Sequence, residues 1–286
     1  MDTELKFAVL IDADNISDKY IKIILEETAN EGVATYKRIY GDWTNPALAS
    51  WKSVLLDNSI IPMQQYSYTT GKNSTDSAMI IDAMDILYSG RVEGFCLVSS
   101  DSDFTRLAAR LRESGMTVIG MGESKTPNSF IAACNKFKYL DILSAADEAE
   151  AEEAAPKAEP AKKPAAQPKK TAQKAAAKKP KEEPKAEKES KPAEPKKQQE
   201  KAIEEPRTSL RTIRRALRTI VRENSDEDNW IMVSQVGNLL DKRYTDFDVR
   251  NFGFSKLTPF LESLDMFEIK DMKKDSSSPQ KYVRLK

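Results

Sequence analysis

The chain contains the stretch Phe95-Cys96-Leu97-Val98-Ser99-Ser100-Asp101-Ser102-Asp103-Phe104, in which an apolar run leads into two carboxylates. Such a run predicts a buried strand, and the aspartates stand at its carboxyl end. A second apolar run, Phe7-Ala8-Val9-Leu10-Ile11, ends in Asp12, and Asp76 stands at the start of a predicted helix. Ligand sites of open α/β sheets lie at the carboxyl ends of strands. We therefore expect these four aspartates to meet at one edge of a sheet.

Residues 5–143 alternate short apolar runs with amphipathic stretches. This alternation predicts βαβ units around a parallel sheet, and so an α/β fold. We expect five strands, near residues 6–11, 33–40, 59–63, 94–99 and 116–121. We expect the helices near residues 18–30, 46–57, 75–88, 102–114 and 127–134.

The segment 144–206 differs in composition from the rest of the chain. Residues 151–206 include nine prolines, no glycine and no aromatic residue, and Ile203 is their one large aliphatic side chain. Such a segment cannot bury enough apolar surface to fold as a globular unit. We predict a disordered Ala/Lys/Pro/Glu linker over 144–206.

Residues 207–286 regain apolar periodicity, which predicts a second, small domain. One predicted helix begins near Leu210, and two shorter ones lie near 233–240 and 257–264. The runs 266–269 and 281–285 predict two strands joined by a polar turn. Three short helices followed by a β-hairpin form a winged-helix pattern.

The net charge is zero, but the charge is unevenly distributed. Residues 1–150 carry 14 Lys/Arg and 22 Asp/Glu, a net charge of −8, whereas residues 151–206 and 207–286 each carry +4. The chain has no histidine, which excludes Ser-His and Cys-His nucleophilic systems and zinc sites that contain histidine. Cys96 and Cys134 lie in apolar surroundings, which favours buried reduced thiols over a disulfide.

The first residues, Met1-Asp2-Thr3-Glu4, are polar and acidic, unlike a signal peptide. No apolar run approaches the ~20 residues of a membrane span. We therefore expect a cytoplasmic protein that does not associate with membranes.

The aspartates have two interpretations. Taken singly, Asp76 or Asp101 is explained as a helix cap, because the helix dipole favours carboxylates in the first turn. Taken together, carboxylates gathered without basic partners favour a divalent cation. Mg²⁺ and Mn²⁺ take oxygen ligands, and ions held by aspartates can activate water and neutralise a phosphate. Phosphodiester hydrolysis fits these residues, and it requires no histidine.

Three neighbours of the aspartates are candidate substrate contacts. Asn15 either orients a ligand or caps the helix near residue 18. Lys72 and Ser100 either contact a substrate phosphate or are a solvated lysine and a turn serine.

Three more residues have open roles. Asp82, six residues beyond Asp76, either supports the aspartates or is an ordinary surface residue. Tyr66 and Tyr68 either stack on bases or pack within their loop.

The C-terminal domain contains a row of arginines at helical spacing, which are Arg211, Arg215, Arg218 and Arg222. On a helix they form one narrow stripe away from the apolar face. This stripe either neutralises phosphates on a nucleic acid or is a solvated helix face.

Four motifs occur in order over residues 5–143: Ile11-Asp12-Ala13-Asp14-Asn15, Gly71-Lys72-Asn73-Ser74-Thr75-Asp76, Ile81-Asp82-Ala83-Met84-Asp85 and Val98-Ser99-Ser100-Asp101-Ser102-Asp103-Phe104. This series resembles the NYN domain, the LabA-like branch of the PIN nuclease superfamily. The resemblance implies a PIN-like fold and a Mg²⁺- or Mn²⁺-dependent ribonuclease whose acidic set is Asp12, Asp76, Asp101 and Asp103. One departure is Ser100, which replaces the glycine of the usual Ser-Gly-Asp and could alter the geometry of the turn.

The segment Asp248-Val249-Arg250-Asn251-Phe252-Gly253-Phe254-Ser255-Lys256-Leu257 resembles part of the OST-HTH or LOTUS domain, and the resemblance covers about 207–286. It implies RNA binding and, in some cases, protein partners. Arg250 and Lys256 would then be RNA contacts; the alternative is ordinary surface charge.

The leading hypothesis is a metal-dependent ribonuclease with a catalytic domain over 5–143, a linker over 144–206 and an RNA-binding winged-helix domain over 207–286. One alternative is an RNA-binding or regulatory protein without catalysis. Another is a phosphatase of the haloacid dehalogenase type, because Asp12 and Asp14 follow a strand in an Asp-x-Asp pattern.

Overall fold

The computed structural model describes residues 4–66, 74–154, 208–226, 228–272 and 280–286. Lys72 and Tyr68 lie outside these residues, as does the predicted linker from 155 to 206. The first part of that predicted linker is not a coil, because the helix α6 (Leu140–Ala154) continues through it. Ala and Glu dominate residues 145–154, and both are good helix formers.

The N-terminal domain is built on a six-stranded sheet in the order β3-β2-β1-β4-β5-β6, and all five neighbouring pairs are parallel. The predicted parallel α/β fold is therefore confirmed. The strands are β1 (Lys6–Asp12), β2 (Val33–Gly41), β3 (Ile61–Gln64), β4 (Gly94–Val98), β5 (Thr117–Gly122) and β6 (Lys136–Tyr139).

Five of these strands match the predicted runs, and β6 was missed. Its sequence, Lys-Phe-Lys-Tyr, is short and alternates lysines with aromatic residues, so it lacks a continuous apolar run. It lies at the edge of the sheet, where one long side of a strand has no partner strand. Phe137 and Tyr139 are buried on one face of β6 and make the packing contact that holds it.

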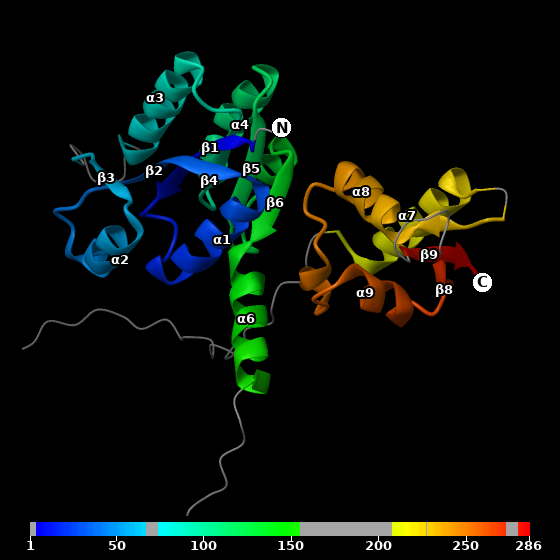
Figure 1. Cartoon of the computed structure of the whole chain (residues 1–286). Helices are drawn as coiled ribbons and strands as arrows, with labels where there is room; N and C mark the ends of the chain where they lie inside the picture. Colours follow the sequence, from blue (N-terminus) through cyan, green and yellow to red (C-terminus); the bar gives the residue numbers. More distant parts are fainter. Residues whose placement is uncertain (1–3, 67–73, 155–207, 227, 273–279) are drawn as a thin grey trace, which may run out of the picture. The chain divides into compact units, whose positions relative to one another are not determined.

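Helices cover both faces of this sheet (Figure 1). One face packs against α1 (Ile21–Glu31), α2 (Trp51–Asn58) and α6. The other face packs against α3 (Ser74–Ser89), α4 (Thr105–Glu113) and α5 (Asn128–Ala133). Short 3₁₀ turns complete the connections at η1 (Asp18–Tyr20), η2 (Pro46–Leu48) and η3 (Ser102–Phe104).

Burial on both faces explains the continuous apolar strands of this domain. In β1, Phe7 and Val9 face the α1 side while Ala8 and Leu10 face the α3 side, and all four side chains are fully buried. Strands covered on both faces read as unbroken apolar runs rather than as an alternation. The polar residues of the domain consequently collect where the strands end.

Within the described part of residues 208–286, the C-terminal domain contains three α-helices and a three-stranded antiparallel sheet in the order β7-β9-β8. The helices are α7 (Leu210–Asn224), α8 (Val233–Arg243) and α9 (Leu257–Ser263), with a 3₁₀ turn η4 (Val249–Phe252). The strands are β7 (Ile231–Met232), β8 (Phe267–Met272) and β9 (Gln280–Leu285). The predicted helices and hairpin are present. The two-residue strand β7, which pairs with β9, was not predicted because it is too short to show a pattern.

The cysteines agree with the expectation of buried thiols. Cys96 and Cys134 are free and buried, and burial raises the pKa of each thiol to about 12. Among the described residues, no helix is both long and apolar enough to cross a bilayer.

Candidate functional site

Neighbouring parallel strands bring the candidate residues to one edge of the sheet. Strands β1 and β4 pair directly, with Ile11 opposite Val98, so that the two strands end side by side. Asp12 is the last residue of β1, and the turn after β4 leads through Asp101 into η3. Asp76 comes from the first turn of α3, the helix that packs over the same part of the sheet.

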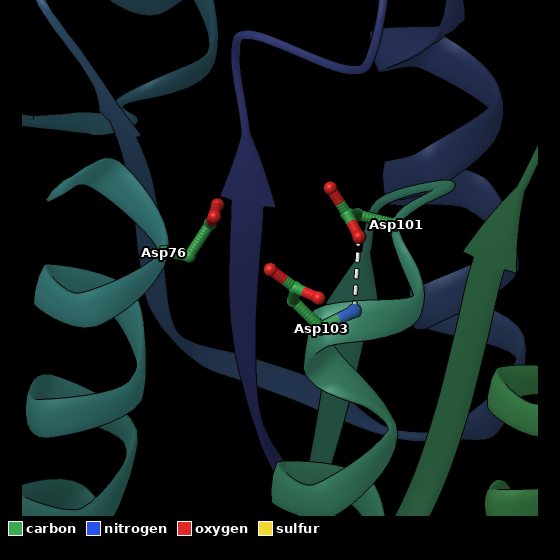
Figure 2. A group of neighbouring side chains, drawn as sticks. All are labelled: Asp76, Asp101 and Asp103. Atoms are coloured by element: carbon green, nitrogen blue, oxygen red, sulfur yellow. Dashed lines mark hydrogen bonds between the residues drawn. The ribbon is translucent and has the colours of Figure 1, made fainter. Parts of the chain in front are cut away.

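Three carboxylates form a compact group, which we call the aspartate cluster: Asp76, Asp101 and Asp103. One carboxylate oxygen from each lies within 4.8 Å of the others. Figure 2 shows Asp76 reaching from α3 toward the turn that carries Asp101 and Asp103. The group offers oxygen atoms only, which is the type of ligand that hard cations prefer.

The local backbone orients two members of the cluster. Asp101 is the N-cap of η3, and its Oδ1 accepts a hydrogen bond of 2.9 Å from the backbone N–H of Asp103. An N-cap aspartate is favoured at a helix start, so the predicted cap role of Asp101 is present. The cap uses Oδ1, and Oδ2 of the same carboxylate is a second oxygen that a cation can bind. The cap role and the ligand role are therefore compatible in one side chain.

Asp12 lies next to the cluster but outside the group of three. It is fully buried, and its Oδ2 accepts hydrogen bonds of 2.7 Å from Asn15 Nδ2 and from Ser99 Oγ. Its Oδ1 accepts a bond of 3.1 Å from the backbone N–H of Asp14. With three donors directed at it, Asp12 has the surroundings of a supporting carboxylate. Its predicted role as a metal ligand stays a prediction.

Burial and neighbouring negative charges both act on the pKa of Asp76 and of Asp12. Burial raises the pKa of Asp76 to about 6, and the negative charges of Asp12, Asp101 and Asp103 add to this effect. Burial also raises the pKa of Asp12, although hydrogen bonds from Ser99 and Asn15 oppose the rise. A bound cation would remove the cost of holding these charges together, which is the electrostatic argument for a metal at this position.

Ser99 was missed by the sequence reasoning and is central to the site. Its hydroxyl donates to Asp12 and also accepts a bond of 3.1 Å from the backbone N–H of Asp101. One side chain thereby links the end of β1 to the turn after β4. The signal was present in the sequence, because Ser99 directly precedes Ser100 and Asp101.

Ser100 and Asn15 are placed by protein contacts. Ser100 Oγ accepts a bond of 3.0 Å from the backbone N–H of Glu123, just after β5. The two turns approach closely, since a Cβ atom on Gly122 would lie 2.6 Å from the Ser99 carbonyl oxygen. Asn15 donates its amide to Asp12 instead of capping the helix near residue 18. Their predicted substrate contacts are untested by this geometry.

Asp82 and Tyr66 were given open roles. Asp82 is not an ordinary surface residue, because it accepts hydrogen bonds from Arg38 and from Tyr40. Tyr66 is 57% exposed, and its backbone carbonyl accepts a bond of 3.3 Å from Gln65. Exposure leaves the Tyr66 ring accessible for stacking.

The predicted arginine stripe lies on the exposed face of α7, and all four of its members, Arg211, Arg215, Arg218 and Arg222, are exposed. The opposite face packs into the domain through Ile213, Leu217, Ile220 and other apolar residues. Ser209 starts the helix, and its hydroxyl accepts from the backbone N–H of Thr212 at 3.3 Å. Arg214, which the sequence reasoning left out, is exposed on the same helix.

The two other predicted RNA contacts differ from each other. Arg250 donates to Asp248 through Nε at 3.1 Å and through Nη2 at 2.8 Å, and Asp248 caps η4. Part of its charge is therefore compensated within the domain. Lys256, at the start of α9, is exposed.

Family comparisons cover both domains. The family model for the NYN domain matches residues 6–141. The N-terminal domain is an NYN domain. The model for the OST-HTH/LOTUS domain matches residues 207–278, so the chain joins an NYN domain to a LOTUS domain. NYN domains form a PIN-like nuclease family, and OST-HTH domains bind RNA.

No curated protein matches the chain. One similar solved structure is a crystal structure of a protein of unknown function from Vibrio parahaemolyticus RIMD 2210633. It is 20% identical, has a TM-score of 0.42, and covers 49% of this chain and 94% of that chain. The similarity is too low to carry a functional argument.

The phosphatase alternative finds little support at the NYN site. An aspartyl nucleophile must contact the substrate phosphorus, and Asp12 is fully buried with its carboxylate held by Asn15 and Ser99. The most accessible member of the aspartate cluster is Asp103, at the start of η3. The site therefore favours a group of metal ligands over a covalent nucleophile.

Proposed function

We propose that this protein is a divalent-metal-dependent ribonuclease in which the NYN domain cleaves RNA that the LOTUS domain binds. The observation that carries the proposal is the aspartate cluster, three carboxylates within 4.8 Å at the carboxyl edge of a parallel sheet. Mg²⁺ or Mn²⁺ fits this all-oxygen donor set. A cation bound there would act as a Lewis acid toward water and toward the scissile phosphate.

The residues around the cluster have supporting roles in this proposal. Asp76, Asp101 and Asp103 hold the cation. Asp12 adds a further negative charge that acts on Asp76, while Ser99 and Asn15 keep the Asp12 carboxylate oriented. A hydrogen-bonded support of this kind fixes the direction of the ligands and raises affinity for the metal.

RNA capture is assigned to the LOTUS domain. The exposed arginines of α7 can each neutralise one phosphate, and Arg250 and Lys256 are secondary candidates. Tethering the two domains in one chain raises the concentration of bound RNA near the NYN site. Asn15, Lys72 and Ser100 remain the candidate contacts with RNA at the cleavage site.

Cleavage of single-stranded and structured RNA by the purified full chain tests this proposal. Cleavage should require Mg²⁺ or Mn²⁺ and should stop with EDTA. Asp101→Asn keeps an oxygen to cap η3 but removes the charge, so it should reduce the rate by about 100-fold or more. Asp85→Asn, on the exposed side of α3, is the matched control and should cut at the wild-type rate.

An Asp101→Asn protein as active as the wild type would refute the assignment of the cluster. Wild-type protein that binds RNA but cleaves none, with any metal and substrate, would favour the alternative of an RNA-binding protein without catalysis.

A further inference from the structure

A second carboxylate on α3 is tied to the sheet by charge and hydrogen bonding. Asp82 Oδ1 accepts a hydrogen bond from Arg38 Nη1, and Asp82 Oδ2 accepts one from the Tyr40 hydroxyl. Arg38 and Tyr40 both belong to β2 and are two residues apart, so they point to the same face of the sheet. We call these three residues the Asp82 clamp.

The clamp is shielded from solvent. Tyr40 is 1% exposed, and the side chains of Arg38 and Asp82 are 24% and 16% exposed. The Arg38 guanidinium also lies 5.3 Å from the centre of the Tyr36 ring. Burial and the Asp82 carboxylate raise the pKa of Tyr40, so the phenol stays protonated and donates. Charge-assisted hydrogen bonds in such surroundings are strong and directional.

The clamp and the metal site share one helix. Asp76 and Asp82 are six residues apart, which is about 9 Å along the axis of α3. Between and beyond them, α3 packs on the sheet through the buried apolar side chains of Met79, Ala83 and Ile86. Apolar packing holds a helix on a sheet but is non-directional, so it permits sliding and rotation. Directed hydrogen bonds at Asp82 set the position that apolar packing leaves open.

The strand that anchors the clamp lies beside the strand that ends in Asp12. Tyr40 is opposite Asp12 in the parallel pairing of β2 with β1. The clamp therefore links α3 to the part of β2 that lies beside the end of β1, where Asp12 is found. Asp76 is the one cluster member supplied by α3, whereas Asp101 and Asp103 share a turn (Figure 2).

We propose that Asp82, held by Arg38 and Tyr40, is a positioning residue that places Asp76 against Asp101 and Asp103. The inference deepens the proposed function, because it assumes that the three carboxylates bind a cation. A metal site tolerates displacements of only about 0.5 Å in its ligands, so a small shift of α3 opens the cluster.

Two measurements on full-length protein test the role of the clamp. The first is the crystal structure of Asp82→Ala and of Tyr40→Phe without metal. We expect Asp76 to move away from Asp101 and Asp103 by about 1 Å or more in Asp82→Ala, and by less in Tyr40→Phe. The second is Mn²⁺ titration by calorimetry, in which Asp82→Ala should bind about 10- to 100-fold more weakly.

The controls separate positioning from general damage. Asp85→Ala removes an exposed carboxylate from the same helix and should bind Mn²⁺ within about twofold of wild type. Tyr40→Phe deletes one hydroxyl and keeps the volume of the buried ring, so we expect this variant to fold. Asp82→Asn keeps the acceptor for Tyr40 and should restore part of the affinity that Asp82→Ala loses.

An unchanged Asp76 position in the crystal structure of Asp82→Ala would overturn the proposal, whatever its Mn²⁺ affinity. A wild-type protein that binds no Mn²⁺ and cuts no RNA would instead refute the proposed function. The displacement of Asp76 in the crystal structures decides the positioning role in either case, because it requires no metal.

Discussion

Ser99 donates a 2.7 Å hydrogen bond to Asp12 and thereby joins the end of β4 to the end of β1. The same hydroxyl accepts a hydrogen bond from the backbone N–H of Asp101, so the Ser99 oxygen contacts both Asp12 and the turn that carries Asp101. The acceptor is a fully buried carboxylate, whose hydrogen bonds oppose the cost of its burial.

Ser99→Ala should destabilise the protein and weaken metal binding. The substitution leaves buried Asp12 with one donor fewer, which should lower the free energy of unfolding by about 1–3 kcal/mol. Mn²⁺ affinity should fall by about tenfold or more, because the turn that carries Asp101 loses its link to β1. Urea unfolding and Mn²⁺ calorimetry measure the two effects. Ser53→Ala, on the exposed side of α2, is the control, and equal behaviour of the two variants would contradict the prediction.

Asp76→Asn should stabilise the metal-free protein while abolishing stabilisation by metal. The pKa of Asp76 is about 6 in the folded protein, above its ordinary 3.8, so the folded state favours the protonated form. The stability that this preference contributes is present below about pH 4 and is lost as the pH rises through about 6. A neutral amide avoids this loss, and at pH 7.5 with EDTA it should raise the unfolding free energy by about 1 kcal/mol or more.

Thermal unfolding with EDTA and with Mn²⁺ checks the Asp76 prediction, with Asp85→Asn as the control. Wild type should gain stability from Mn²⁺, and Asp76→Asn should gain little. A lower unfolding temperature for Asp76→Asn in EDTA would show that repulsion within the cluster is not the dominant effect.

Mn²⁺ binding by the wild type should strengthen as the pH rises from 5 to 7. A protonated Asp76 cannot serve as an anionic ligand, so binding of the cation must displace the proton. The pKa of about 6 places the change within this range. Calorimetry in buffers of different ionisation enthalpy would detect the released proton. Affinity that is constant between pH 5 and pH 7 would exclude Asp76 from the ligands.

Arg215→Ala combined with Arg218→Ala should weaken RNA binding without loss of stability. Both side chains are exposed on α7. A plot of the logarithm of the RNA affinity against the logarithm of the salt concentration should become less steep by about one unit for each phosphate contact removed. Fluorescence anisotropy over a series of salt concentrations measures this slope. The matched control removes two exposed charges from the NYN domain, Lys22→Ala with Lys52→Ala. A slope equal to that of wild type would assign RNA binding to another surface.

The fold of the NYN domain was predictable wherever local patterns were strong. Strands covered on both faces give continuous apolar runs, and β1, β2, β4 and β5 all lie close to their predicted ranges. Strand β6 and helix α6 were missed. The pattern of β6 is short and half polar, and α6 continues into a segment whose composition resembles a linker.

The candidate site was predictable in its residue types but not in its internal roles. Asp76, Asp101 and Asp103 meet as expected, whereas Asp12 lies beside them with three hydrogen-bond donors. The sequence also left the role of Asp82 open, because its partners on β2 are more than 40 residues away along the chain.

Sequence alone determined that carboxylates would follow buried strands, since apolar runs and the residues that end them are local features. Tertiary structure decided which carboxylates lie within 4.8 Å of one another, which one accepts a hydrogen bond from Ser99, and which one on α3 accepts hydrogen bonds from β2. These distances depend on the order of strands in the sheet and on the packing of α3 across it. Both join residues that are remote in the chain, and no local pattern records them.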